Sequence, residues 1–188
     1  MTNSHKILLA SSSPRRRFLL EEARLQHDIL KVEFEEILSG TESIYDAPLL
    51  LSESKSDQCP APKENEIIIT CDTIVANNGK ILGKPLSPDE AKNFLKSFSN
   101  NSHLVISGTT LRAKEKIITF NSISEVKFYS IPEKAINEYI TTGNPMDKAG
   151  AYGIQDSFGI QYVKEIKGCY YNIMGLPVSQ IIENLKLF

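Results

Sequence analysis

The chain has 188 residues, enough for one domain or two closely associated lobes, and 41% of them are hydrophobic, as in globular proteins. Its 21 Lys and Arg are balanced by 23 Asp and Glu, and a net charge of −2 argues against a protein that binds a long nucleic acid. No apolar run approaches the roughly 20 residues that cross a bilayer, and the N-terminal MTNSHK has no signal-peptide pattern, so we expect a cytoplasmic protein without a membrane partner.

The first predicted elements are a strand and a helix joined by a loop rich in serine and arginine. Residues 7–10 form a short apolar run typical of a buried strand, and Ser13 followed by Pro14 predicts the start of a helix. Residues 15–17, all arginines, then occupy the first helical turn, where unpaired N–H groups and the macrodipole already favour anions. Either a phosphate binds here and compensates for the crowded cations, or the arginines simply point to solvent.

The next part of the chain predicts two strands with an irregular stretch between them. Residues 27–38 are strand-like at their start and acidic at their end, whereas residues 39–65 are polar and irregular. An apolar patch at residues 48–51 suits the opening of a short helix. Residues 66–75 predict a clear strand, and Asn78-Gly79 behind it is the signal of a tight type I′ hairpin.

The rest of the chain mixes strands and helices. Ser87 as N-cap, with Glu90 three residues later, predicts a helix over residues 87–98. The other predicted elements are antiparallel strands at 103–113 and 116–131, a helix at 132–143, a glycine-rich irregular stretch at 143–155, a strand at 159–168 and an amphipathic helix at 178–188. This order combines β-α units with antiparallel hairpins and predicts an α/β fold with a mixed sheet.

Asp72 is an acid within an otherwise apolar strand, where an ionised carboxylate is costly unless it is paired or bound to a metal. Thr73 stands beside it and Lys84 follows the hairpin, so one interpretation is a structural ion pair between an acid and a lysine. The other interpretation is a metal site. Asp72, a phosphate-sized anion site and a second acidic cluster at Glu35-Glu36 together suit a divalent cation that bridges to phosphates.

Lys148 and Gln155 lie in the glycine-rich stretch. This stretch is either a simple connection or a compact segment that brings a cation and an amide together, and the Gln155 amide offers the donor and acceptor that suit a base edge. The scattered histidines and the three widely spaced cysteines form no nucleophile or metal-ligand signature.

Three motifs in register, LASSSPRR, CDTIV followed by GKP, and DKAGAYGIQ, resemble the Maf family of nucleoside triphosphate pyrophosphatases over residues 7–185. The resemblance implies one domain over residues 1–188, with a mixed, curved sheet and flanking helices in two lobes around a cleft, related to inosine-triphosphatase-like enzymes. It also implies a hydrolase that cleaves between the α and β phosphates, releasing a nucleoside monophosphate and pyrophosphate with a divalent metal, Mg²⁺ or Mn²⁺. The expected partner is the triphosphate substrate, and a homodimer is left open.

Carried over by position, the resemblance gives Asp72 the role of catalytic carboxylate, as proton acceptor for water or as metal ligand, and places Glu36 near the metal. The residues expected to bind the substrate's phosphates are Ser11, Arg15, Arg16, Lys55, Lys84 and Lys148. Cys71, Ser107 and Asn144 depart from the family's usual pattern.

Arg15, Thr73 and Gln155 match the branch that looks like dTTP and UTP pyrophosphatases. Two alternatives stay open: a pyrophosphatase for modified nucleotides, such as 7-methyl-GTP or a methylated pyrimidine triphosphate, and a nucleotide-binding regulator of cell division, the role behind the family's septum-formation name. The branch resembling 7-methyl-GTP pyrophosphatases carries other residues at these positions. Retention of Asp72, Lys84 and Lys148 favours catalysis over pure binding.

Overall fold

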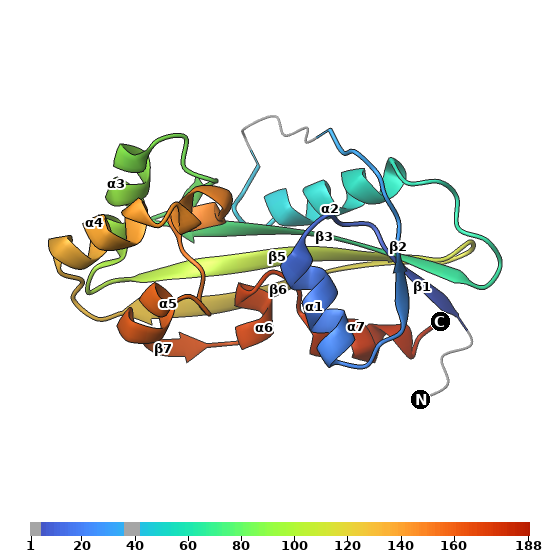
Figure 1. Ribbon diagram of the computed structural model, residues 1–188. Coiled ribbons are helices and arrows are strands. Elements are labelled where there is room, and N and C mark those ends of the chain that lie inside the picture. Colours follow the sequence, from blue (N-terminus) through green and yellow to red (C-terminus); the bar gives the residue numbers. More distant parts are fainter. Residues whose placement is uncertain (1–4, 36–41) are drawn as a thin grey trace. The chain divides into compact units, whose positions relative to one another are not determined.

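The computed structural model describes residues 5–35 and 42–188, which form an α/β fold with one mixed sheet (Figure 1). The strands in these residues are β1 (Lys6–Leu9), β2 (His27–Ile29), β3 (Glu66–Asn77), β4 (Lys80–Leu82), β5 (Ser102–Arg112), β6 (Ile117–Phe128) and β7 (Val163–Lys167). Their order is β2-β1-β3-β5-β6-β7, with β4 paired to β3. Pairing is parallel where β1 meets β2 and β3 and antiparallel where β3 meets β4 and β6 meets β7, so the predicted mixed α/β class is confirmed.

Helices lie between these strands in the chain and after the last of them. They are α1 (Pro14–Glu22), α2 (Ala47–Asp57), α3 (Pro88–Phe98), α4 (Glu133–Thr141), α5 (Ser157–Tyr162), α6 (Tyr170–Ile173) and α7 (Val178–Leu185), with short 3₁₀ turns η1 (Asn144–Asp147) and η2 (Ala149–Ala151). In the described part of the chain, none of the helices has the length and hydropathy needed to cross a membrane.

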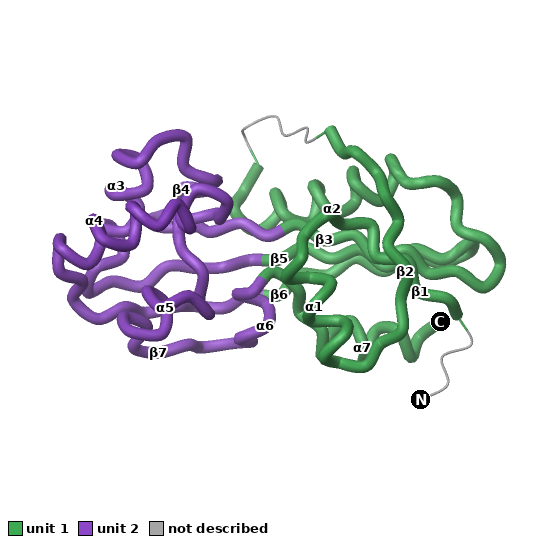
Figure 2. Tube along the Cα trace, in the orientation of Figure 1, with its two compact units in different colours: residues 1–72, 107–122, 175–188 green, residues 73–106, 123–174 purple. Residues whose placement is uncertain are grey.

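The chain divides into two compact units that are each built from separated stretches of sequence (Figure 2). Unit 1 comprises Met1–Asp72, Ser107–Ser122 and Gly175–Phe188, and unit 2 comprises Thr73–Ile106 and Ile123–Met174. The boundary falls inside β3, β5 and β6. The single domain over residues 1–188, the cleft and the relationship to inosine-triphosphatase-like enzymes stay predictions.

Local signals located several elements correctly. The hairpin after β3 is of type I′, because Asn78 and Gly79 have φ values of 50° and 74°. At the start of α3, the Ser87 side chain accepts a hydrogen bond from the Glu90 amide at 3.1 Å, as the capping pattern predicts. The predicted helices at the positions of α1, α4 and α7 are confirmed as well.

In unit 1, helix α2 packs against β3 and β5. The Ser52 hydroxyl lies 2.9 Å from the Thr110 hydroxyl, and the Thr70 hydroxyl donates to the Ser52 carbonyl at 2.7 Å. Gly108 of β5 allows a close approach of the backbone, since a Cβ at this position would lie 2.0 Å from the Pro48 carbonyl oxygen. These contacts fix α2 on the sheet.

Helix α2 also corrects the prediction that this region is irregular. It runs for 11 residues, well beyond the apolar patch that suggested a short helix. Its buried side carries Ser52, Lys55 and Ser56 besides Leu51, so apolar residues do not recur with helical spacing. Tertiary contacts of polar side chains, which no periodicity reveals, stabilise this helix.

The predicted strand at residues 159–168 is wrong over its first part, which forms the end of α5, and only β7 is extended. Ile160, which contributed to the apolar pattern of a buried strand, is 73% exposed. Gly159 lies against the preceding turn, because a Cβ there would be 2.5 Å from the Gly153 carbonyl oxygen. This close contact favours a compact helical turn over an extended strand.

The core of unit 2 contains an aromatic cluster around a histidine. The His103 ring stacks on Phe98 with a centroid separation of 4.1 Å, and its Nε2 lies 2.8 Å from the Tyr152 hydroxyl. The His103 side chain is 2% exposed, and this burial lowers its pKa from 6.5 to about 3. His103 is therefore a neutral member of the core.

We expect the free energy of unfolding to fall as the pH drops from 6.5 towards about 3. In this window the unfolded chain binds a proton at His103 that the folded chain excludes, so acid favours unfolding by up to about 1.4 kcal/mol per pH unit. His103→Phe should remove this part of the slope. Urea unfolding of both proteins between about pH 4 and about pH 7 measures it, and equal slopes would contradict the assignment.

Candidate active site

The residues predicted for the site fall into two groups, one in each unit. Unit 1 holds Ser11, Arg15, Arg16, Lys55 and Asp72, and unit 2 holds Thr73, Lys84, Lys148 and Gln155. Glu36, the acid expected near the metal, lies outside the described residues.

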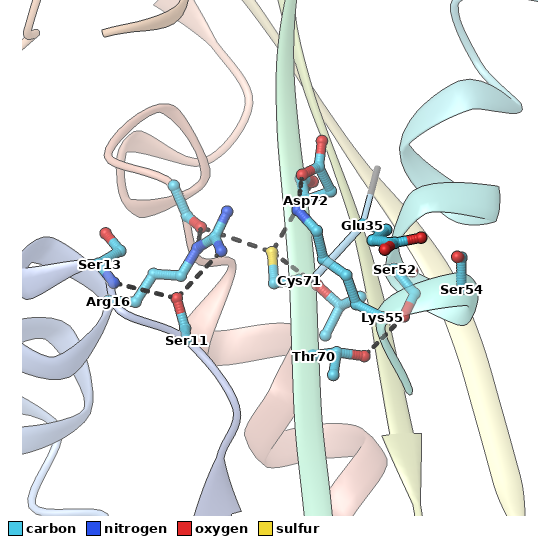
Figure 3. Close-up of polar contacts among 12 residues, drawn as sticks. Ser11, Ser13, Arg16, Glu35, Ser52, Ser54, Lys55, Thr70, Cys71 and Asp72 are labelled. Atoms are coloured by element: carbon cyan, nitrogen blue, oxygen red, sulfur yellow. Dashed lines mark hydrogen bonds and ion pairs between the residues drawn. The ribbon is translucent and has the colours of Figure 1, made fainter. Parts of the chain in front are cut away.

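In unit 1, the serine-rich loop and the start of α1 hold Arg16 (Figure 3). Arg16 Nε donates to the Gly175 carbonyl at 2.9 Å, and Nη1 donates to Ser11 Oγ at 3.2 Å. The Ser13 amide donates to the same hydroxyl at 3.2 Å. Ser13 is the N-cap of α1, as predicted, but its side chain makes no capping hydrogen bond and the first turn contains no acid. The guanidinium is thus oriented by two oxygens beside the unpaired N–H groups of the helix.

The three consecutive arginines have different environments. Arg17 is exposed and pairs with Glu21 one turn later at 2.7 Å, so the interpretation of a solvent-facing side chain applies to it. Arg15 and Arg16 are half-buried. The interpretation that a bound anion compensates for the crowded positive charge therefore concerns only Arg15 and Arg16.

Gly175 connects Arg16 with strand β3. Its carbonyl accepts from Arg16 and also lies 3.5 Å from Cys71 Sγ, within hydrogen-bonding distance of the thiol. The φ of 112° at Gly175 falls in the region that favours glycine. A residue distant in sequence thereby sets the direction of the arginine.

Lys55 of α2 is the lysine that faces Asp72. Its Nζ lies 2.5 Å from Asp72 Oδ1, and the two side chains are 10% and 13% exposed. Thr70, which bonds to α2, lies on the same side of β3 as Asp72, whereas Cys71 contacts Gly175 on the opposite side. Figure 3 shows Lys55 and Arg16 approaching β3 from these two sides.

Asp72 offers one carboxylate oxygen to a divalent metal. Within residues 5–35 and 42–188, no group of three His, Cys, Asp or Glu is arranged to hold a metal by itself. Lys55 engages Oδ1, and the described residues leave Oδ2 without a hydrogen-bond partner. One available carboxylate oxygen suits Mg²⁺ or Mn²⁺, because Mg²⁺ usually takes one or two carboxylates plus substrate phosphates.

Glu35, the described member of the expected acidic cluster, is exposed. Two hydrogen bonds fix its backbone. The Glu35 amide donates to Gln58 Oε1 at 2.9 Å, and Gln58 Nε2 donates to the Glu35 carbonyl at 3.0 Å. Glu35 is therefore anchored to the residue that directly follows α2, the helix that carries Lys55.

In unit 2, Lys148 is buried and surrounded by oxygens. Its Nζ donates to the Asn144 carbonyl at 2.6 Å and to Asp147 Oδ1 at 2.7 Å, and lies 3.6 Å from Asp156 Oδ2. The Gly150 amide donates to the carbonyl of Gly83, the residue before Lys84, at 3.0 Å. The structure thus brings the backbone segments that carry the two lysines together.

Lys84 is exposed, and Thr73 and Gln155 are half-buried. Gln155 lies in a turn that is closed by a hydrogen bond from the Asp156 amide to the Gly153 carbonyl at 3.1 Å. Among the residues that the structure describes, no hydrogen bond or ion pair engages the Lys84 ammonium or the Gln155 amide. Both groups are available to a ligand.

Sequence reasoning missed the residues that hold these side chains in place. Gly175 stands before Leu176-Pro177, where a glycine followed closely by proline signals a turn. Asp156 directly follows Gln155, and Tyr139 belongs to the apolar face of α4. No local pattern indicated that these residues contact the site.

A family model described as Maf-like protein matches residues 6–188. The chain is 40% identical over 183 residues to a protein of Bacillus cereus (strain G9842) named dTTP/UTP pyrophosphatase, a match covering 97% of this chain and 95% of the relative. A protein of the same name from Bacillus cereus (strain ATCC 10987 / NRS 248) is 40% identical over 186 residues, 99% of this chain and 91% of the relative. The Staphylococcus aureus Ham1 protein aligns with a TM-score of 0.44 and 14% identity over 65% of this chain and 71% of that chain, a likeness too weak to carry an argument. Since the family match and the relatives both span nearly the whole sequence, the chain belongs to the Maf family.

Proposed function

We propose that this protein is a nucleoside triphosphate pyrophosphatase that hydrolyses dTTP and UTP to the nucleoside monophosphate and pyrophosphate. The observation that carries the proposal is the contact between Lys55 and Asp72. Lys55 orients the Asp72 carboxylate within an otherwise apolar strand, at the position where the family resemblance expects the catalytic acid. Relatives at 40% identity named dTTP/UTP pyrophosphatase support the choice of substrate.

Asp72 is the proposed proton acceptor for the attacking water. Lys55 orients the carboxylate through Oδ1, which leaves Oδ2 for the water or for a metal. When bound, Mg²⁺ or Mn²⁺ supplies charge neutralisation on the phosphate oxygens. Glu36 is proposed as a further acid near the metal.

The proposed phosphate ligands are the cations that the family resemblance places near the substrate. Arg15 and Arg16 crowd the first turn of α1, an arrangement that is unfavourable in the empty protein and favourable beside a phosphate. Ser11 adds a hydroxyl, and Lys55, Lys84 and Lys148 add ammonium groups. For Lys148, a phosphate oxygen would replace the carboxylate of Asp147, which is 69% exposed.

Arg15, Thr73 and Gln155 are the proposed specificity residues. Gln155 offers a donor and an acceptor that no described residue occupies, and both are needed to bind the edge of a pyrimidine base. The same chemistry extends to modified pyrimidine triphosphates.

The test is pyrophosphate release from dTTP, UTP, CTP, ATP, GTP and 7-methyl-GTP in the presence of Mg²⁺ or Mn²⁺. Preferential turnover of dTTP and UTP is the expected result. A preference for 7-methyl-GTP would contradict the proposed substrate and favour the other branch of the family. Binding of triphosphates without any turnover would contradict catalysis and favour the regulatory role in cell division.

Arg15→Ala is expected to raise the KM for dTTP about tenfold, because the variant loses a charge-assisted contact with a phosphate. The matched control is Arg17→Ala, which removes an exposed arginine from the same helical turn. Steady-state kinetics should leave this control within about twofold of the wild type. Equal KM values for the two variants would mean that Arg15 does not bind substrate.

The location and the partners belong to the same proposal. A cytoplasmic enzyme would act on the free nucleotide pool, and the balanced charge of 21 basic and 23 acidic residues supports a small substrate rather than a nucleic acid. The homodimer also stays a prediction.

A further inference from the structure

We propose that Tyr139 and Asp156 are positioning residues for substrate recognition, which together hold the turn that carries Gln155 and the side chain of Lys148. The proposal rests on the proposed function, because it assigns Gln155 to the base and Lys148 to the phosphates of a nucleoside triphosphate. All four residues belong to unit 2.

One phenol connects both ends of the turn. The Tyr139 hydroxyl donates to Asp156 Oδ2 at 2.7 Å and accepts from the Gly153 amide at 3.3 Å. Tyr139 is 5% exposed, and burial, together with its hydrogen bond to Asp156, raises its pKa. The hydroxyl therefore stays protonated and continues to donate.

The turn is fixed at its ends and leaves one side chain available. The Asp156 amide bonds to the Gly153 carbonyl at 3.1 Å, and a Cβ on Gly153 would lie 2.7 Å from the Asp156 carboxylate. Ile154 is buried in the core cluster. Gln155, between Ile154 and Asp156, is half-buried without a hydrogen-bond partner among the described residues.

A glutamine that reads a base depends on such support. Its amide presents a donor and an acceptor, and by turning over it matches either the uracil and thymine edge or the cytosine edge. The amide alone therefore does not choose between these bases. Selectivity requires that the backbone be held in one place, because this restricts the rotamers of the side chain and so which orientation of the amide reaches the base. The contacts of Tyr139 set that place.

The same carboxylate also limits the position of Lys148. Asp156 Oδ2, which accepts from Tyr139, lies 3.6 Å from Lys148 Nζ, and Asp156 is 17% exposed. Of the two carboxylates around Lys148, Asp156 is thus the more buried one and is held by Tyr139, whereas Asp147 is 69% exposed. Tyr139 acts on the lysine through Asp156.

The hydroxyl of Tyr139 can be removed without removing its ring. The ring stacks on Phe158 with centroids 4.6 Å apart, a contact that Tyr139→Phe retains. Tyr162 offers a matched control, since its ring lies 5.2 Å from the same Phe158 and no described residue forms a hydrogen bond with its hydroxyl. Tyr162→Phe therefore removes a hydroxyl that has no role in the turn.

The experiment compares kcat and KM for dTTP, UTP and CTP among the wild type, Tyr139→Phe, Tyr162→Phe, Gln155→Ala and the Tyr139→Phe/Gln155→Ala double variant. Tyr139→Phe should raise the KM for dTTP and UTP roughly 5- to 20-fold, with a smaller change in kcat and a weaker preference over CTP. Tyr162→Phe should stay within about twofold of the wild type. In the Gln155→Ala background, Tyr139→Phe should change the base preference no further.

An unchanged base preference in Tyr139→Phe, or an additional change in the double variant, would overturn the proposal. If Tyr139→Phe does not fold, Asp156→Ala provides the second test and should weaken the preference in the same direction; an unaltered preference there also overturns it. A wild type that hydrolyses no triphosphate would instead contradict the proposed function. The positioning role is then measured by calorimetric binding of dTTP and CTP to the same proteins, where an unchanged preference would again overturn it.

Discussion

Asp72→Asn is expected to lower kcat for dTTP and UTP by at least about a thousandfold while the protein stays folded. The amide has the shape of the carboxylate, but it does not accept a proton from water, and its neutral oxygen binds a divalent cation more weakly. Its oxygen still accepts a hydrogen bond from Lys55, so the free energy of unfolding should fall by only about 1–3 kcal/mol. Pyrophosphate release and thermal unfolding measure the two effects.

The control is Asp57→Asn, which neutralises an exposed acid at the end of α2. Its kcat should equal that of the wild type, because Asp57 lies on the solvent side of the helix. Turnover in Asp72→Asn close to that of this control would refute the assignment of the catalytic carboxylate.

Gly108→Ala is expected to destabilise the protein by about 3 kcal/mol or more. The added Cβ would lie 2.0 Å from the Pro48 carbonyl oxygen and 2.5 Å from the Leu49 amide nitrogen. Both are backbone atoms of α2, so relief requires displacement of the whole helix. Since α2 carries Lys55, kcat should fall together with the free energy of unfolding in urea.

Gly83→Ala is the matched control for this substitution. A Cβ at Gly83 would meet no atom within 4 Å, and the Gly83 carbonyl would still accept from the Gly150 amide. Its stability should stay within about 0.5 kcal/mol of the wild type. Equal stabilities of the two glycine variants would show that α2 moves away from β5 at little cost.

The parts of the fold that could be predicted are those encoded by neighbouring residues. The turn at Asn78-Gly79 needs two positive φ values, and Ser87 finds its hydrogen-bond partner three residues away. Asp72 was recognisable because a charge interrupts an apolar strand. The placement of the arginines in the first turn of α1 likewise follows from Ser13 and Pro14 alone.

What could not be predicted depends on residues that meet only in the folded chain. Lys55 and Asp72 are 17 positions apart, and the helix that brings them together buries polar side chains that leave no apolar period. The partner of Arg16 is 159 positions away. Tyr139 looks like a core residue in the sequence, and only the contact of its hydroxyl with Asp156 reveals its second role.

The interleaving of the two units has a consequence for synthesis on the ribosome. Unit 1 contains Met1–Asp72, which are made before unit 2, but also Gly175–Phe188, which are made after it. Chains grow at about 5–20 residues per second, so strand β3 and the arginine loop wait several seconds for Gly175, which holds Arg16. Unit 2 ends at Met174, so all its residues emerge before Gly175–Phe188 of unit 1. The nascent chain is thus able to complete its second unit before its first.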